Sequence, residues 1–246
     1  GATLLGSCAV AGTWQEKWNT LTDENGISLT QAFVDAGLDI NEVHTAARNN
    51  ANTDDFFEFH IEQGPVLEEQ DLAVGVVNAI AGAKRFAVTL KGLAGHAGTV
   101  PMPMRQDALA GASEMILAIE KIATQKGIVA TVGHLRCLSG AVNVISGATT
   151  FSLDIRSIDD ALRDETLSLI IEQLNMIADK RRIKMDVTPT HQAPAVKCDE
   201  RLQQRLLDAS EKSDIPQFIL SSGAGHDTMA MAAICPVAML FMRCEK

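Results

Sequence analysis

His60 stands in a setting where an imidazole could bind a metal ion. Residues 57–61 alternate apolar and polar side chains, and His60 lies between Glu58 and Glu62. This alternation predicts a half-buried strand with one polar face. Imidazole is a common metal ligand, and nearby carboxylates can fix its tautomer. A surface strand with alternating charges would show the same pattern, so the segment by itself leaves both interpretations open.

His96 lies in a turn loosened by glycine. Residues 85–90 alternate as a strand does, and residues 108–123 follow a helical pattern. The segment between them contains residues that bend the chain or end a strand: Gly92, Gly95, Gly98, Pro101 and Pro103. The side chain of His96 could therefore reach a group outside its own module. A hydrogen bond from a turn histidine to nearby backbone is the alternative.

Two polar residues lie in or at the end of apolar segments. Asn143 interrupts the apolar run of residues 141–145, where it could bind a ligand or satisfy local backbone groups. Arg156 ends the strand pattern of residues 151–156. Its alternative role is a salt bridge to Asp154 or Asp159.

Gly223 opens a glycine-containing segment before a helical pattern. The N–H groups at such a helix start could contact an anion, although glycine-rich helix starts are common. His226 and Asp227 follow directly. They could form an acid–base pair or simply pack at the helix start.

Composition narrows the class of protein. The chain has 246 residues, of which 46% are hydrophobic and 21% are charged. These proportions are ordinary for a soluble globular enzyme. A formal net charge of −10 argues against a nucleic-acid partner. The five cysteines are an odd number without close pairing, which favours reduced thiols in a cytoplasmic protein. No apolar stretch approaches the roughly 20 residues of a membrane span.

The pattern of elements predicts an α/β fold with one module inserted into another. Strand, helix, strand, strand, helix and strand are expected in that order over residues 84–90, 105–125, 128–135, 149–156, 159–181 and 183–189. This βαββαβ order is that of a ferredoxin-like sandwich. We therefore expect residues 82–190 to be inserted between residues 1–81 and 191–246. Neither of these outer parts is expected to close alone.

Five segments together resemble one family: HIEQG, KGLAGHAGTVPMPMRQD, AVNVISG, FSLDIRSIDD and SGAGHDTMAMA. They are similar to segments of the M20 metallopeptidase superfamily, in the amidohydrolase branch that contains allantoate amidohydrolases and N-carbamoyl-L-amino acid hydrolases. The resemblance covers nearly the whole chain, and the GHAGTVPM, DIRSIDD and SGAGHDTMAMA forms favour the allantoate enzymes. It implies a zinc-peptidase-like α/β catalytic domain with an inserted ferredoxin-like lid that forms a homodimer.

The resemblance also implies a role for each candidate residue. His60 would be a ligand of a centre of two divalent ions, Mn²⁺ or Zn²⁺. His96 would reach from one subunit's lid into the partner's active site and stabilise the developing oxyanion together with Asn143. Arg156 would hold the substrate carboxylate, and the backbone of Gly223 would contact the substrate.

The function implied is metal-dependent hydrolysis of the ureido C–N bond of allantoate, which gives ureidoglycine, ammonia and carbon dioxide. The ions would lower the pKa of a water and polarise the carbonyl, and a glutamate would accept the proton. The alternatives are hydrolysis of N-carbamoyl-L-amino acids or of β-ureido acids, a dipeptidase, and a non-catalytic dimerising fragment.

Two departures from the family pattern bear on this expectation. Ala83 stands where many relatives have a substrate-contacting glutamine. The family's other metal ligands and its base glutamate correspond to positions before residue 1 and after Cys244. The chain is therefore expected to be an interior part of the enzyme and to be inactive alone.

Overall fold

A computed structural model describes residues 3–49, 52–138 and 140–244. The fold is α/β, and the chain divides into two compact units. The inserted unit runs from Ala81 to Ala195, and the outer unit combines the residues up to Ile80 with those from Val196. The second boundary falls later than the expected residue 190, because the last strand of the inserted unit continues to Ala193.

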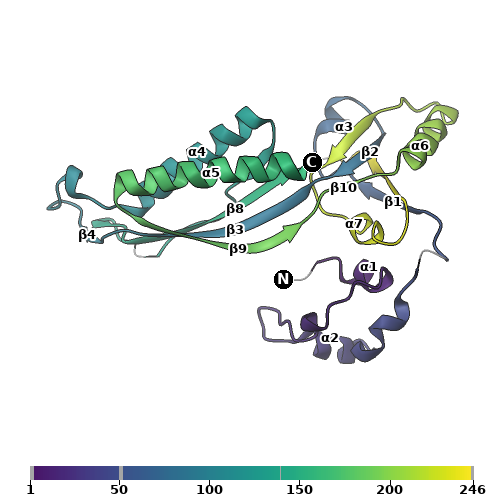
Figure 1. Ribbon diagram of the computed structural model, residues 1–246, viewed down its shortest axis with the longest axis horizontal. Coiled ribbons are helices and arrows are strands. Elements are labelled where there is room, and N and C mark those ends of the chain that lie inside the picture. The colour runs from purple at the N-terminus through teal and green to yellow at the C-terminus, as the bar shows by residue number, and fades with distance from the viewer. Residues whose placement is uncertain (1–2, 50–51, 139, 245–246) are drawn as a thin grey trace. The chain divides into compact units, whose positions relative to one another are not determined.

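The inserted unit has the predicted βαββαβ order. Its sheet is antiparallel in the order β5-β8-β3-β9, and β6 also pairs with β8. The strands are β3 (Gly82–Lys91), β5 (Val129–Thr131), β6 (Leu135–Cys137), β8 (Ala148–Ser157) and β9 (Lys184–Ala193). Helices α4 (Ala108–Lys126) and α5 (Asp160–Arg181) lie along one face of this sheet (Figure 1). One strand predicted over residues 128–135 is in fact two short strands.

Local signals set the ends of both long helices. The side chain of Asp107 accepts hydrogen bonds from the first N–H groups of α4, and Asp159 does the same for α5. Gly127 ends α4 with a φ of 67°. Helix α4 therefore begins after the expected residue 105, because Asp107 caps it and the 3₁₀ helix η3 (Met102–Met104) precedes it.

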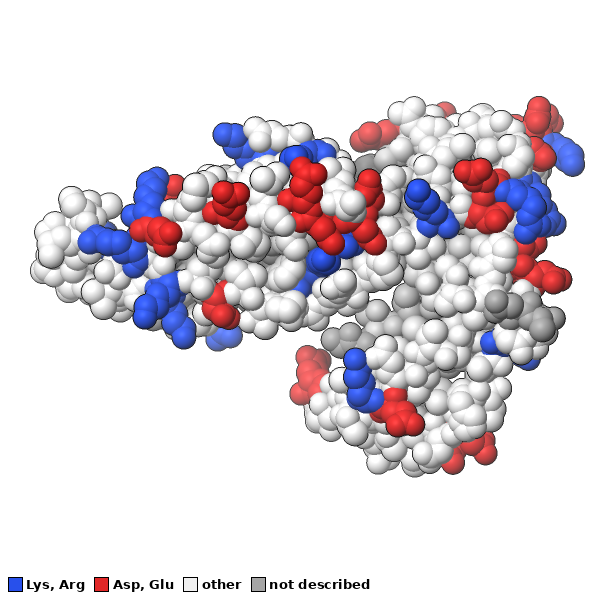
Figure 2. All heavy atoms as spheres, viewed as in Figure 1, with Lys and Arg blue, Asp and Glu red and all other residues white. Residues whose placement is uncertain are grey.

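The core of the inserted unit lies between the sheet and the two helices. Alternate residues of β8 are buried, and they pack with apolar residues of β3, α4 and α5. The fully buried members include Val88, Leu90, Met115, Leu153, Ile155, Ile170 and Leu174. Acidic and basic side chains are interspersed over the surface of this unit (Figure 2), where ion pairs such as Lys126–Glu165 and Lys180–Glu114 join α5 to α4.

A buried arginine holds the end of the inserted unit where the chain enters and leaves it. Arg163 is 2% exposed and forms ion pairs with Asp160 and Asp164. The carboxylate of Asp160 also accepts a hydrogen bond from the backbone N–H of Ala195. A side chain at Gly82 would collide with Arg163, Asp160 and Ala195, so only glycine fits there.

The outer unit is built on a second sheet, in the order β1-β12-β2-β10 with β11 also paired to β2. Its strands are β1 (Phe56–Ile61), β2 (Val74–Ile80), β10 (Val196–Lys197), β11 (Ile219–Ser222) and β12 (Val237–Met242). The helical segments are α1 (Leu5–Val10), η1 (Glu16–Trp18), α2 (Leu29–Asp35), η2 (Ile40–Ala46), α3 (Val66–Glu69), α6 (Glu200–Lys212) and α7 (Thr228–Met231). No helix among the described residues is long and apolar enough to cross a membrane.

The two outer segments complete one sheet together. Strand β12 from the end of the chain pairs in parallel with β1 and antiparallel with β2. A buried cluster that includes Leu67, Val77, Ile80, Met239 and Phe241 packs against this sheet. The two outer segments therefore share one sheet, in which strands of one segment pair with strands of the other.

One expectation about burial in β1 is wrong. Phe59 and Ile61 were expected on the buried face, yet they are 60% and 45% exposed. Strand β1 is at the edge of the sheet. Of the three apolar residues Phe57, Phe59 and Ile61, which share one face of β1, Phe57 lies beneath the guanidinium of Arg205 from α6.

Candidate functional site

Three metal-binding side chains come together in the outer unit. Glu58 and His60 are two residues apart on β1 and therefore point to the same face of the strand. His226 approaches them from the segment just before α7, and the two imidazole ring centres are 4.7 Å apart. One possible ligand atom from each of the three residues lies within 4.8 Å of the others. Within the part of the chain that the structure describes, this is the one such group of three or more.

Hydrogen bonds leave one nitrogen of each imidazole available as a ligand. Nδ1 of His60 is 2.7 Å from the carbonyl oxygen of Ile61, so Nδ1 carries the proton and Nε2 has the lone pair. Nε2 of His226 is 2.8 Å from Oγ of Ser222, and that hydroxyl is also 3.1 Å from the carbonyl oxygen of Ala224. A proton on Nε2 of His226 lets the Ser222 hydroxyl donate to Ala224. Nδ1 of His226 then presents its lone pair toward Glu58.

Glu58 is held in a fixed orientation. Its Oε2 accepts hydrogen bonds from the backbone N–H of Thr228, at 2.7 Å, and from the Thr228 hydroxyl. Its Oε1 lies 3.7 Å from Nδ1 of His226. Burial lowers the pKa of His226 despite the opposing effect of Glu58, so this contact joins a carboxylate to a neutral imidazole.

The donor set fits a divalent ion. Two neutral imidazole nitrogens and one carboxylate oxygen are ligands that Zn²⁺ and Mn²⁺ accept. The hydrogen bonds from Ser222 and Thr228 are of the kind that orient metal ligands in proteins. Glu58, His60 and His226 would therefore hold one ion.

Asp227 and Gly223 lie outside this cluster of donors. The carboxylate of Asp227 accepts a hydrogen bond of 2.6 Å from the hydroxyl of Ser7, which ties the start of α7 to α1. Gly223 is exposed in the connection between β11 and α7. An added Cβ at Gly223 would meet no atom within 4 Å, so packing does not require glycine there.

His96 and Asn143 come together at one end of the inserted unit. The short strands β4 (Gly95–His96) and β7 (Val144–Ile145) pair with His96 opposite Val144, and the carbonyl oxygen of Asn143 accepts from the N–H of Ala97. Nδ1 of His96 accepts from the N–H of Gly98, at 3.0 Å. Arg105 braces the same turn by donating to the carbonyl oxygens of Ala97 and Val100.

Arg156 lies at the other end of the inserted unit. Strand β8 begins at Ala148, near the end of the inserted unit that carries β4 (Figure 1). Arg156 is the second-last residue of β8, so it lies at the opposite end of that strand. Because an antiparallel strand rises about 3.4 Å per residue, the length of β8 separates Arg156 from His96 by roughly 25 Å. The guanidinium of Arg156 donates to both oxygens of Asp154, at 2.7 and 2.8 Å. The salt bridge considered as an alternative is therefore present.

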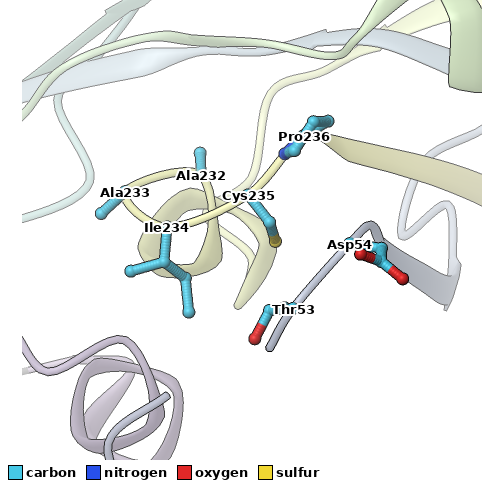
Figure 3. A pocket seen from close by; sticks show the side chains of 7 residues that line it. All are labelled: Thr53, Asp54, Ala232, Ala233, Ile234, Cys235 and Pro236. Carbon is cyan, nitrogen blue, oxygen red and sulfur yellow. The ribbon is translucent and has the colours of Figure 1, made fainter. Parts of the chain in front are cut away.

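A separate depression in the outer unit contains a cysteine. It lies between the segment before β1 and the loop that precedes β12 (Figure 3), and it is lined by Thr53, Asp54, Ala232, Ala233, Ile234, Cys235 and Pro236. Burial, followed by the influence of Asp55, raises the pKa of the Cys235 thiol. The thiol is therefore protonated at neutral pH, and the lining contains no histidine or lysine that could favour the thiolate.

Comparison with known proteins defines the class. Residues 20–246 match the peptidase family M20/M25/M40, and the chain belongs to this family. It is 37% identical to the allantoate deiminase of Arabidopsis thaliana, over 99% of this chain and 52% of that protein. It is 38% identical to the N-carbamoyl-L-amino acid amidohydrolase of Geobacillus stearothermophilus, over 98% of this chain and 59% of that protein. The chain thus spans between half and three fifths of these relatives.

Solved structures agree with this assignment. A hydantoinase/carbamoylase family amidase from Burkholderia ambifaria is 30% identical with a TM-score of 0.88, over 99% of this chain and 60% of that one. AtUAH, crystallised in complex with glyoxylate, is 34% identical with a TM-score of 0.82, over 100% of this chain and 60% of that one.

Sequence reasoning missed three residues around the metal-binding cluster. Glu58 was expected on the same strand face as His60, as a carboxylate that could fix the His60 tautomer, but not as a ligand itself. Ser222 and Thr228 carried no sequence signal, because their partners His226 and Glu58 become visible only in the folded chain.

Proposed function

We propose that the protein hydrolyses the ureido C–N bond of allantoate with the help of two divalent ions, Mn²⁺ or Zn²⁺. The observation that carries this proposal is the Glu58–His60–His226 cluster in a member of the M20 family. The names of the relatives support a ureido acid as substrate, because one acts on allantoate and another on N-carbamoyl-L-amino acids. Ureidoglycine, ammonia and carbon dioxide would be the products from allantoate.

Each site residue has a separate task in this proposal. When bound, the ions lower the pKa of a water and polarise the ureido carbonyl. Glu58, His60 and His226 hold one ion in place. Arg156 binds the substrate carboxylate, and the backbone of Gly223 contacts the substrate. These groups fix the substrate before reaction.

His96 and Asn143 donate hydrogen bonds to the ureido carbonyl oxygen, which becomes negative as water adds to the ureido carbon, before the C–N bond breaks. His96 can donate there through Nε2–H, because its Nδ1 already accepts from the N–H of Gly98.

The distance between His96 and Arg156 supports a site that is completed by a second copy of the chain. A small ureido acid cannot contact two residues that are separated by the length of β8, roughly 25 Å. We therefore propose a homodimer formed through the inserted unit, in which His96 and Asn143 of one chain complete the site that contains Arg156 of the other. The binding of glyoxylate by AtUAH, a structure that superimposes over the whole chain, agrees with a carboxylate subsite.

The proposed reaction predicts metal-dependent release of ammonia. The protein that carries this chain is treated with a chelator, resupplied with Mn²⁺ or Zn²⁺, and assayed with allantoate and with N-carbamoyl-L-amino acids. His60→Ala should abolish activity and weaken the affinity for Zn²⁺ by at least about 100-fold, because loss of a direct donor costs no less than loss of a residue that only orients a donor. His44→Ala removes an exposed histidine of the same unit and should change neither property.

Each result has a defined meaning. Metal binding without turnover of either ureido acid would contradict the proposed reaction. Faster turnover of N-carbamoyl-L-amino acids than of allantoate would show that they are the substrate. Ala83, which stands in place of a substrate-contacting glutamine, is compatible with that alternative. Unchanged Zn²⁺ affinity in His60→Ala would contradict the metal site itself.

The shared site predicts complementation between two inactive variants. His96→Ala and Arg156→Ala should each be inactive as homodimers. In a mixed dimer, one site combines the intact Arg156 of one chain with the intact His96 of the other. Coexpression in equal amounts should therefore restore about one quarter of the wild-type activity, because half of the dimers are mixed and each has one complete site.

Light scattering before the assay confirms that each variant still forms dimers. If both variants are inactive and the mixture regains nothing, the site is completed within one chain and the dimer proposal is wrong.

A further inference from the structure

Asp154 helps to fix the position of the Arg156 guanidinium. The two are separated by one residue on β8, so their side chains lie on the same face of the sheet, the one opposite the helices. Asp154 accepts two parallel hydrogen bonds from Nε and Nη2 of Arg156. A planar fork held at two points has a defined plane and direction.

Arg85 holds Asp154 from the neighbouring strand. It lies directly opposite Asp154 in the pairing of β3 with β8, and its Nε donates to Oδ2 of Asp154, at 2.7 Å. Burial alone would raise the pKa of Asp154, but the hydrogen bonds from Arg156 and Arg85 outweigh it and lower the pKa. The carboxylate is therefore ionised at neutral pH.

The charge balance of this group of three suits recognition of an anion. One carboxylate faces two guanidinium groups, so the group retains one positive charge. The Asp154, Arg156 and Arg85 side chains are 23%, 27% and 42% exposed, so solvent and a ligand can reach them. Asp154 pairs with the Nε–Nη2 edge of Arg156.

We propose that Asp154, held by Arg85, is a positioning residue that aims the Arg156 guanidinium at the carboxylate of the ureido acid. This inference rests on the proposed function, because it takes Arg156 as the group that binds that carboxylate. An aspartate that served stability alone would not distinguish substrates by their carboxylate.

The test compares Asp154→Asn with the unchanged protein on two substrates: allantoate, and its analogue with the carboxylate converted to the amide. Asparagine keeps the shape but loses the charge and one acceptor. The KM for allantoate should rise about tenfold with little change in kcat, because a misaligned anchor binds less well. Turnover of the amide should not change, and Asp154→Glu should restore part of the lost affinity. Asp186→Asn, an exposed aspartate on β9, is the matched control.

The possible outcomes separate this inference from the proposed function. No change in KM, or an equal loss with both substrates accompanied by a lower Tm, would overturn the positioning role. If Asp154→Asn does not fold, Arg85→Met must reproduce the loss that is selective for allantoate, or the inference fails. An effect of Arg156→Lys without one of Asp154→Asn would overturn this inference and leave the proposed function intact.

Discussion

Replacing Arg156 with lysine is expected to lower kcat/KM for allantoate by about 100-fold or more, which corresponds to roughly 2.7 kcal/mol of lost stabilisation. Lysine keeps the positive charge but loses the planar fork that pairs with a carboxylate at two points. It also cannot pair with Asp154 through two parallel N–H groups, as Arg156 does. The charge remains, but the geometry that directs it is gone.

The measurement is steady-state kinetics of ammonia release, with the thermal unfolding of each variant alongside. Arg136→Lys is the control, because Arg136 is an exposed arginine on β6 of the same sheet. Near-normal kinetics of Arg156→Lys would mean that Arg156 serves only in the ion pair with Asp154. If the Tm of Arg156→Lys falls strongly together with its kcat/KM, the loss of activity would come from impaired folding.

Replacing Arg163 with methionine is expected to lower the free energy of unfolding by about 3 kcal/mol, the low end of the range for breaking a buried ion pair. Arg163 is 2% exposed, and its removal leaves Asp160 and Asp164 without their buried cation. These carboxylates are 40% and 46% exposed, so water compensates part of the loss.

Urea unfolding with hydrogen exchange on the inserted unit measures this change. Lys126→Met breaks the more exposed pair with Glu165 and should cost less than about 1 kcal/mol. Equal stability losses in the two variants would show that burial of Arg163 does not increase the strength of its ion pairs.

The inserted unit could be predicted closely because its signals are local. Asp107 and Asp159 are capping residues at the start of helical patterns, and Gly127 ends one of them. Strand β8 of this unit alternates clearly between buried and partly exposed residues. The sheet of the outer unit gives no such local signal, because β1 finds its partner β12 at the far end of the chain.

The candidate site was predictable one residue at a time but not as a group. His60 could be found because its strand pattern and the HIEQG segment are contiguous. Its partner His226 lies far along the chain, before α7, and comes near β1 only in the folded protein, so the sequence left the role of His226 open. The exposure of Phe59 and Ile61 was missed for a related reason. Alternation shows which residues share a face, but it does not show whether another element covers that face.

The junction between the units has a consequence for the order in which the chain folds. Ile80 and Val196 pair as neighbouring strands of the outer sheet, although about 115 residues of the inserted unit separate them. Within the inserted unit, Ala83 already pairs with Ala193. Once that unit has folded, the outer strands need to close only a gap of a few residues, which reduces the loop-closure cost by roughly 3 kcal/mol. The inserted unit thus acts as a clamp that brings the two halves of the outer sheet together, so a lesion that delays its folding also delays assembly of the Glu58–His60–His226 site.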